Sequence, residues 1–215
     1  LGGFDQGAVD LRYALRFAAR DERLKDFKRV LVGHSWGGFS VMNSLDTDVV
    51  VEGAVALCGF VSSAGVIAQN TMGKCRFAEW ACRNYFKLFN RIRFGKMANF
   101  DAIRSLKKTK KPVLLFYGEQ DATVRFSGNG ARVREAVRGM ENITYVSCPE
   151  KGHNVYLTVD AETYMHKTFG EISSKIKKDR SQAPTLYAAA DYRRMTAEDP
   201  GVMDAVVSFC LARLR

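Results

Sequence analysis

An α/β fold with a mostly parallel sheet is the fold class that this 215-residue sequence predicts, and two observations support it. Four short apolar runs have the length and composition of buried strands. Segments with helical spacing of apolar residues lie between them, and strands that alternate with helices form parallel βαβ units. The predicted strands span residues 30–33, 53–58, 112–118 and 143–148.

A tight strand-to-helix turn connects the first predicted strand to a helical run over residues 36–45. It has the pattern Gly-x-Ser-x-Gly, from Gly33 through Ser35 to Gly37. Because no loop separates the two elements, the serine must adopt a strained backbone conformation. We expect both glycines to be required, since any Cβ there would strike the neighbouring strand or helix. The turn places the serine at a helix N-terminus, where developing negative charge is stabilised.

Helical spacing also predicts the remaining regular elements. One helix covers residues 8–20, and a second is capped by Ser127. Asp160 is the predicted N-cap of a third, and Asp199 with Pro200 forms a favourable start for the last helix.

Residues 60–108 interrupt the alternation of strands and helices, and they carry an amphipathic helix. The simpler interpretation is a helical insertion whose apolar face covers the core while its basic face is solvated. In the alternative, the basic face attracts an acidic substrate or an anionic membrane surface. The apolar face comprises Phe77, Ala81, Tyr85, Leu88 and Ile92, and the basic face Arg76, Arg83, Lys87 and Arg91.

The net charge of +10 is concentrated in one segment. Residues 74–111 contain 12 Lys and Arg but 2 Asp and Glu, so the rest of the chain is neutral. No recognition-helix, OB or RRM pattern accompanies this charge, and nucleic-acid binding is therefore not expected. No apolar run approaches the ~20 residues that a membrane span requires.

Five cysteines are present, without a C-x-x-C motif or metal-ligand spacing. Two of them, Cys58 and Cys148, lie within predicted strands. This arrangement favours reduced core thiols and a cytoplasmic setting.

A serine hydroxyl needs a base, usually histidine, to act as a nucleophile at neutral pH. Of the three histidines, His34 lies inside the turn, where we expect its side chain to pack away from the serine. His166 lies within a polar-faced helix and is expected at the surface. His153 follows Gly152 in the loop after the last predicted strand, which is where a catalytic base would lie.

A carboxylate that orients this base must come from the carboxyl end of another strand. Asp121 follows the strand over 112–118 by three residues and is the preferred candidate. Glu119 in the same loop is its competitor, whereas Asp101 and Asp160 belong to the insertion and to a helix start. The resulting chain order, serine then aspartate then histidine, is the order found in α/β-hydrolases.

Three motifs together resemble the α/β-hydrolase superfamily, especially its esterase, lipase and serine-aminopeptidase-like members. They are GHSWG at 33–37, GEQDATV at 118–124 and GH at 152–153. The resemblance implies Ser35 as nucleophile, His153 as base and Asp121 as orienting acid. It also implies the Trp36 backbone N–H as one oxyanion-hole donor.

The resemblance also implies that residues 1–59 and 109–215 of this sequence form the hydrolase core and that residues 60–108 form a basic helical cap. The strands that normally precede the first helix, with the loop that supplies the second oxyanion donor, are absent from this sequence. We therefore expect a longer chain or a partner chain to supply them.

The predicted function is that of a serine hydrolase that cleaves a carboxylic ester, thioester or amide through an acyl-serine intermediate. No metal or organic cofactor is expected. The expected partner is a small acyl substrate, with an anionic or interface-bound one favoured by the basic segment. A carboxylic ester is the default, and a serine peptidase, an acyltransferase or a non-catalytic binding module are the alternatives.

Overall fold

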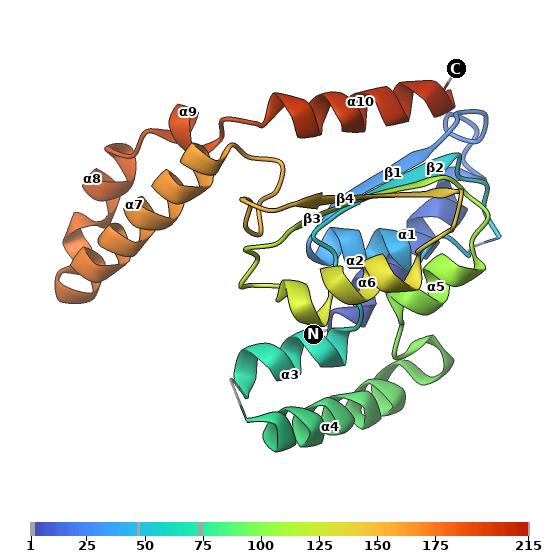
Figure 1. Ribbon diagram of the computed structural model, residues 1–215, viewed down its shortest axis with the longest axis horizontal. Helices are drawn as coiled ribbons and strands as arrows, with labels where there is room; N and C mark the ends of the chain where they lie inside the picture. Colours follow the sequence, from blue (N-terminus) through green and yellow to red (C-terminus); the bar gives the residue numbers. More distant parts are fainter. Residues whose placement is uncertain (1–2, 47, 73–74, 215) are drawn as a thin grey trace.

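Four parallel strands form the centre of the molecule, in the order in which they occur along the chain (Figure 1). The computed structural model describes residues 3–46, 48–72 and 75–214. Val30 lies opposite Gly53, and Val113 opposite both Ala54 and Ile143. The predicted α/β fold with its parallel sheet is confirmed. The strands are β1 (Val30–His34), β2 (Gly53–Leu57), β3 (Val113–Gly118) and β4 (Ile143–Cys148).

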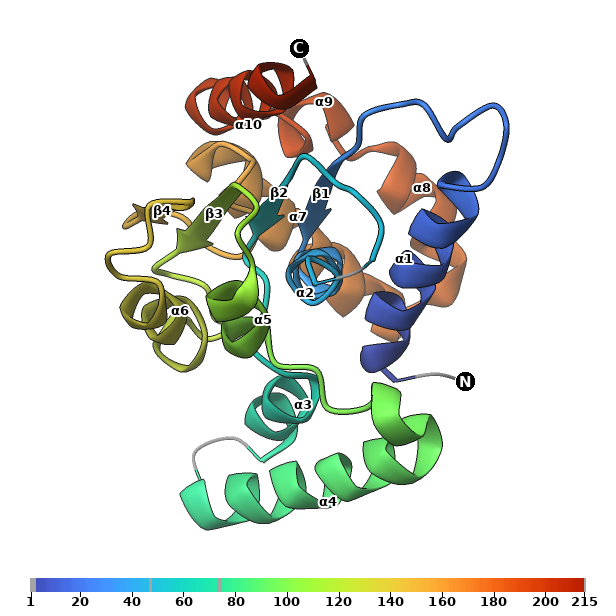
Figure 2. The same ribbon diagram turned by 90° about the vertical axis from the view of Figure 1, so that its right-hand side faces the viewer.

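Helices cover both faces of this sheet. The helices are α1 (Asp5–Ala18), α2 (Trp36–Met42), α3 (Ser63–Thr71), α4 (Arg76–Phe94), α5 (Ala102–Lys108), α6 (Gly130–Ala136), α7 (Val159–Lys178), α8 (Ala183–Ala188), α9 (Tyr192–Met195) and α10 (Pro200–Leu214). In Figure 1, α1, α2, α5 and α6 lie on one face and α10 on the other. Figures 1 and 2 show α3 and α4 beyond the first helical layer. None of these described helices is both long and apolar enough to span a bilayer.

The core lies on both sides of the two central strands, β2 and β3, all of whose residues are buried. Successive strand residues point to opposite faces. Ala56 and Leu115 pack toward the layer of α1, α2, α5 and α6. Leu57 and Phe116 pack on the other face, against Val206 of α10. Burial on both faces explains why these strands are continuous apolar runs.

Two predicted helix starts differ from the structure. Ser127 lies in a 3-10 turn, and α6 begins only after Asn129. Asp160 lies within the first turn of α7, because Thr158 has the extended backbone of an N-cap and accepts the Ala161 N–H at 3.1 Å. The predicted start of α10 is confirmed, since the Asp199 carboxylate accepts the Val202 N–H at 3.0 Å.

The expectation that the apolar face of α4 covers the core is wrong. Phe77 is 76% exposed and Ile92 is 77% exposed, and Leu88 is exposed as well. The buried residue of α4 is polar Asn90. An amphipathic pattern shows that a helix has an apolar face but not which way this face points, and here the opposite face turns toward α3.

A buried polar network holds α4 in this orientation. One carboxylate oxygen of Asp5 accepts hydrogen bonds from the Asn90 side chain (3.0 Å) and the Asn99 backbone N–H (2.8 Å). The same Asn90 amide donates to Ser63 at 3.0 Å, which ties α1, α3 and α4 together. Asp5 is completely buried, and its other oxygen has no hydrogen-bond partner among the described residues. Burial therefore raises the pKa of Asp5 above 3.8.

This raised pKa predicts a pH dependence of stability. Between 3.8 and the raised pKa, folded Asp5 retains a proton that the unfolded chain has released, so the free energy of unfolding falls as pH rises. We expect Asp5→Asn to remove this fall. Urea unfolding between about pH 4 and 7 measures it, with Asp10→Asn on the exposed face of α1 as the control. If the free energies of unfolding of the wild type and of Asp5→Asn differed by the same amount at every pH, the raised pKa of Asp5 would be contradicted.

Candidate active site

The turn between β1 and α2 holds Ser35 in a strained conformation. Its φ is 56° and its ψ is −114°, in a region that L-residues rarely adopt. Gly33 is required, because a Cβ there would lie 2.4 Å from the carbonyl carbon of Gly37. The same expectation for Gly37 is wrong, since a Cβ on it would meet nothing within 4 Å. The second crowded position is Gly38, whose Cβ would lie 3.0 Å from the Cα of Gly59.

The structure brings the three predicted site residues into one hydrogen-bonded chain. The Nε2 atom of His153 lies 2.9 Å from the Ser35 hydroxyl, and its Nδ1 atom lies 2.8 Å from a carboxylate oxygen of Asp121. The three residues follow β1, β3 and β4, whose carboxyl ends lie at the same edge of the parallel sheet. A serine, an imidazole and a carboxylate in this arrangement can generate a nucleophile.

Asp121 is held so that only one of its oxygens faces the histidine. Its side chain is 2% exposed, and one oxygen accepts the backbone N–H groups of Thr123 (2.9 Å) and Val124 (2.8 Å). The other oxygen accepts from Nδ1 of His153. Because a carboxylate can only accept, Nδ1 carries the proton, and Nε2 is left to accept from the serine hydroxyl.

The competing carboxylates have other partners. Glu119 accepts a hydrogen bond from Ser147, and Asp101 is the N-cap of α5. Asp160 forms an ion pair with an arginine of α9 at 2.6 Å. Of these candidates, the structure places only Asp121 beside His153.

His34 has a role that the sequence did not reveal. Its Nε2 atom donates to the backbone carbonyl of His153 at 2.8 Å, and the two rings lie with their centroids 4.7 Å apart. Burial lowers the pKa of His34, which favours the neutral ring. His34 is therefore a positioning residue for the loop of His153. His166 is exposed, as expected.

A second positioning residue, Glu162, was missed by sequence reasoning. It lies in the first turn of α7 and is buried. Its carboxylate accepts the backbone N–H groups of Gly152 (3.1 Å) and Asn154 (2.8 Å), on either side of His153. A single glutamate near a helix start carries no motif, so no signal in the sequence could have identified it.

Cys58 lies below the same site, and its sulfur is within 4.8 Å of the ligand atoms of Asp121 and His153. Each of these three side chains is of a type that can ligate a metal ion. Burial raises the pKa of the Cys58 thiol to about 12. Asp121 and His153 already use their facing atoms on each other. A metal ion at this place would have to break the hydrogen bond between Asp121 and His153.

A cavity of about 290 Å³ lies beside the Ser35 hydroxyl. Trp36 is the first residue of α2, so its backbone N–H belongs to the helix end, where amides have no acceptor within the helix. The Trp36 side chain forms part of the cavity wall and donates to the Phe4 carbonyl at 2.7 Å. The lining residues are Phe4, Ser35, Trp36, Phe60, Val66, Ile67, Asn70, Thr71, Thr123 and Val124.

Comparisons with known proteins identify related sequences and folds. The profile of the prolyl oligopeptidase family matches residues 5–171. An esterase from Pyrococcus furiosus superposes with a TM-score of 0.50 at 13% identity, over 80% of this chain and 61% of that chain. Acetyl xylan esterase 1 from Thermoanaerobacterium sp. has a TM-score of 0.49 at 18% identity, with coverages of 68% and 47%. A puromycin hydrolase has a TM-score of 0.49 at 21% identity, with coverages of 68% and 22%. No curated protein matches the sequence.

The position of Glu162 predicts a specific effect of its replacement. Glu162→Gln replaces one of the two oxygens by an NH2 group, which can only donate, so either the Gly152 or the Asn154 N–H loses its acceptor. The loop then loosens around His153, and the free energy of unfolding falls by about 1 kcal/mol. The downfield NMR signal expected from the His153 Nδ1 proton that is donated to Asp121 should broaden or disappear. Glu171→Gln, on an exposed position of α7, is the control. An unchanged downfield signal in Glu162→Gln would show that the loop does not depend on this carboxylate.

Proposed function

The chain belongs to the prolyl oligopeptidase family, and we propose that it is a serine hydrolase that cleaves a carboxylic ester through an acyl-serine intermediate. The observation that supports this most directly is the hydrogen-bonded chain from Ser35 through His153 to Asp121. It supplies a nucleophile, a base and an orienting acid at the mouth of a cavity. The chain spans 61% of the length of the Pyrococcus esterase, so this activity is a proposal for the whole protein.

The proposed reaction follows from the hydrogen bonds of the site. As the Ser35 oxygen attacks the acyl carbonyl, its proton passes to Nε2 of His153. Asp121 stabilises the imidazolium that forms, and the Trp36 N–H stabilises the oxyanion of the tetrahedral intermediate. His153 then protonates the leaving alcohol, and water releases the acyl group from Ser35 with His153 as base.

The size of the cavity supports an ester with a short acyl group. At about 290 Å³ it lies at the small end of ligand sites, and most of its walls are apolar, including Phe60, Val66 and Ile67. Membership of the prolyl oligopeptidase family favours a second candidate, cleavage of a peptide or aminoacyl amide by the same three residues. Both reactions proceed through an acyl-serine, so only the substrate distinguishes them.

Variants of the three residues test the assignment. We expect Ser35→Ala to abolish both turnover and labelling by a fluorophosphonate probe, and His153→Ala to be nearly as severe, because the two act as a unit. Asp121→Asn should lower kcat by about 10⁴, since it favours the wrong tautomer of His153. Glu119→Gln is the matched control and should retain activity. If Glu119→Gln lost activity while Asp121→Asn kept it, the acid would be misassigned.

The same assay distinguishes the two substrate classes. Hydrolysis of acetyl or propionyl esters at higher kcat/KM than both long-chain esters and aminoacyl amides would support the proposed esterase. A preference for aminoacyl amides would favour the peptidase. If the probe labels Ser127→Ala but not Ser35→Ala, the labelled residue is Ser35, the proposed nucleophile. Failure to label the whole wild-type protein, rather than residues 1–215 alone, would contradict a serine hydrolase and favour a binding module.

The free edge of β1 supports a further part of the proposal, that additional strands pair with it. β1 is the outer strand of the described sheet, and Val32 is 51% exposed on it. An exposed apolar edge promotes self-association. We expect residues 1–215 alone to associate or be inactive, and Val32→Lys to reduce association more than Val50→Lys in a loop, measured by light scattering. A monomeric 215-residue protein with ordinary turnover would contradict the need for further strands.

A further inference from the structure

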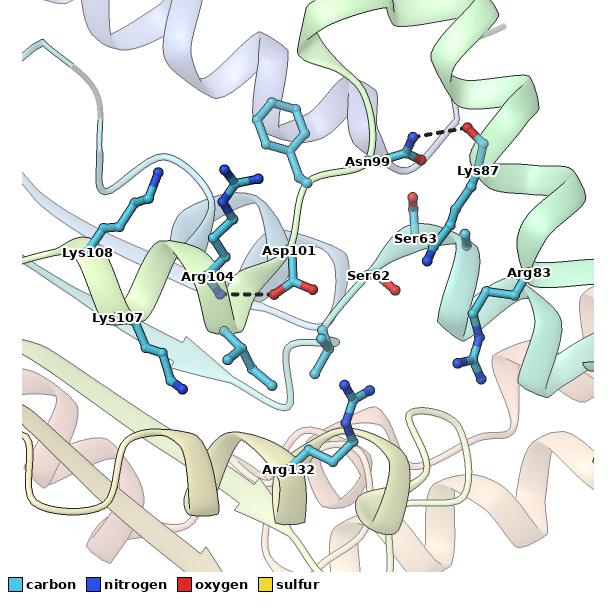
Figure 3. A pocket seen from close by; sticks show the side chains of 14 residues that line it. Ser62, Ser63, Arg83, Lys87, Asn99, Asp101, Arg104, Lys107, Lys108 and Arg132 are labelled. Atoms are coloured by element: carbon cyan, nitrogen blue, oxygen red, sulfur yellow. Dashed lines mark hydrogen bonds between the residues drawn. The ribbon is translucent and has the colours of Figure 1, made fainter. Parts of the chain in front are cut away.

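A second cavity, of about 660 Å³, opens between α3, α4, α5 and α6 and shares no lining residue with the cavity beside Ser35 (Figure 3). In Figure 3 the side chains of Arg83, Lys87 and Arg132 point toward the space beside Ser62. Arg83 and Lys87 belong to α4 and Arg132 to α6, so only the tertiary fold brings these positive charges together. The cations that line this cavity are Arg83, Lys87, Arg104, Lys107, Lys108 and Arg132.

The protein itself leaves most of this positive charge unneutralised. Asp101 is the carboxylate among the lining residues, and it is engaged as the N-cap of α5, where it accepts the Arg104 N–H at 2.9 Å. Arg83 pairs with Glu79 at 2.6 Å. None of the other five lining cations forms an ion pair within the part of the chain that the structure describes. Like charges gathered around one cavity repel each other, and a bound anion relieves this repulsion.

Two further features of the wall suit an anion. The Nε atom of Arg83 is buried and has no hydrogen-bond partner among the described residues, and such an unsatisfied donor is unfavourable. The first turn of α3, from Ser62 to Ala64, lines the same cavity and contributes the positive end of a nine-residue helix. The Arg83 side chain and a helix end therefore line the space into which Lys87 and Arg132 also point, while the Arg83 Nε atom itself is closed off from solvent.

From these contacts we propose that the cavity is a binding site for a multiply charged phosphate group. Phosphate suits the site because the guanidinium group of Arg132 can bind its oxygens with two parallel hydrogen bonds, and Lys87 can add a point charge. The volume and the number of cations exceed what one small monovalent anion needs. The site is independent of the hydrolase chemistry proposed for Ser35.

Two sources can present this phosphate chemistry. One is a soluble organic polyphosphate. The other is a phosphorylated lipid headgroup, since Lys87 belongs to α4, whose exposed apolar residues would then rest at the membrane interface. Those residues include Phe77, Leu88 and Ile92.

Calorimetry with inorganic triphosphate tests the soluble source. We expect Lys87→Gln/Arg132→Gln to weaken binding about 10-fold or more, because two charge-assisted contacts are lost. The control Arg91→Gln/Lys177→Gln removes the same two charges outside the cavity and should change affinity less than about 2-fold. Citrate should bind more weakly than triphosphate. The measurement can be repeated in Ser35→Ala, so failure of the hydrolase proposal does not affect it.

Vesicle co-sedimentation tests the lipid source, with phosphatidylcholine alone and with phosphatidic acid added. Binding that requires phosphatidic acid, and is lost in both Lys87→Gln/Arg132→Gln and Phe77→Ser/Ile92→Ser, would assign the phosphate to a headgroup. Triphosphate binding that only the cavity variant weakens would assign it to a soluble ligand. Absence of binding in both arms, equal loss in the control variant, or equal affinity for citrate would overturn the proposal and leave a solvated basic surface.

Discussion

The strained backbone at Ser35 is the constraint on which the arrangement of the site depends. With a φ of 56°, this residue ends β1 and begins α2 without a loop. Its N–H donates to the Leu57 carbonyl at 2.8 Å, and its carbonyl accepts the Phe39 N–H at 3.0 Å, so both neighbouring elements hold the conformation. Gly33 permits the close approach of α2. The serine hydroxyl is therefore presented at one fixed place, at the end of the sheet and the start of a helix.

The loops after β3 and β4 reach that place through a second close approach. A Cβ on Gly118 would lie 2.1 Å from the Gly152 carbonyl oxygen, so only a glycine lets the two loops touch. Glu162 binds the backbone on both sides of His153, and His34 binds its carbonyl. Contacts from three elements thus hold the backbone that carries the imidazole, and the ring itself is bound by Asp121 and Ser35 and lies against the His34 ring.

Helix α3 connects the proposed hydrolase site to the basic cavity. Its first turn lines the basic cavity, whereas Val66 and Ile67 in its later turns line the cavity beside Ser35. Polar contacts that link Asp5, Asn90 and Ser63 help to hold α4 beside it. Because this arrangement leaves the apolar side chains of α4 exposed, the segment combines a charged cavity and an apolar surface next to the site.

Local sequence by itself determined the four strands and the order of the candidate residues. The four strands were predicted to within one residue at each end, and Ser35, Asp121 and His153 were selected, because strand periodicity and turn chemistry act within a few residues. Only the tertiary structure decided which faces meet. The outward apolar face of α4 and the contacts of Glu162 depend on segments distant in the chain, whose approach no local pattern records.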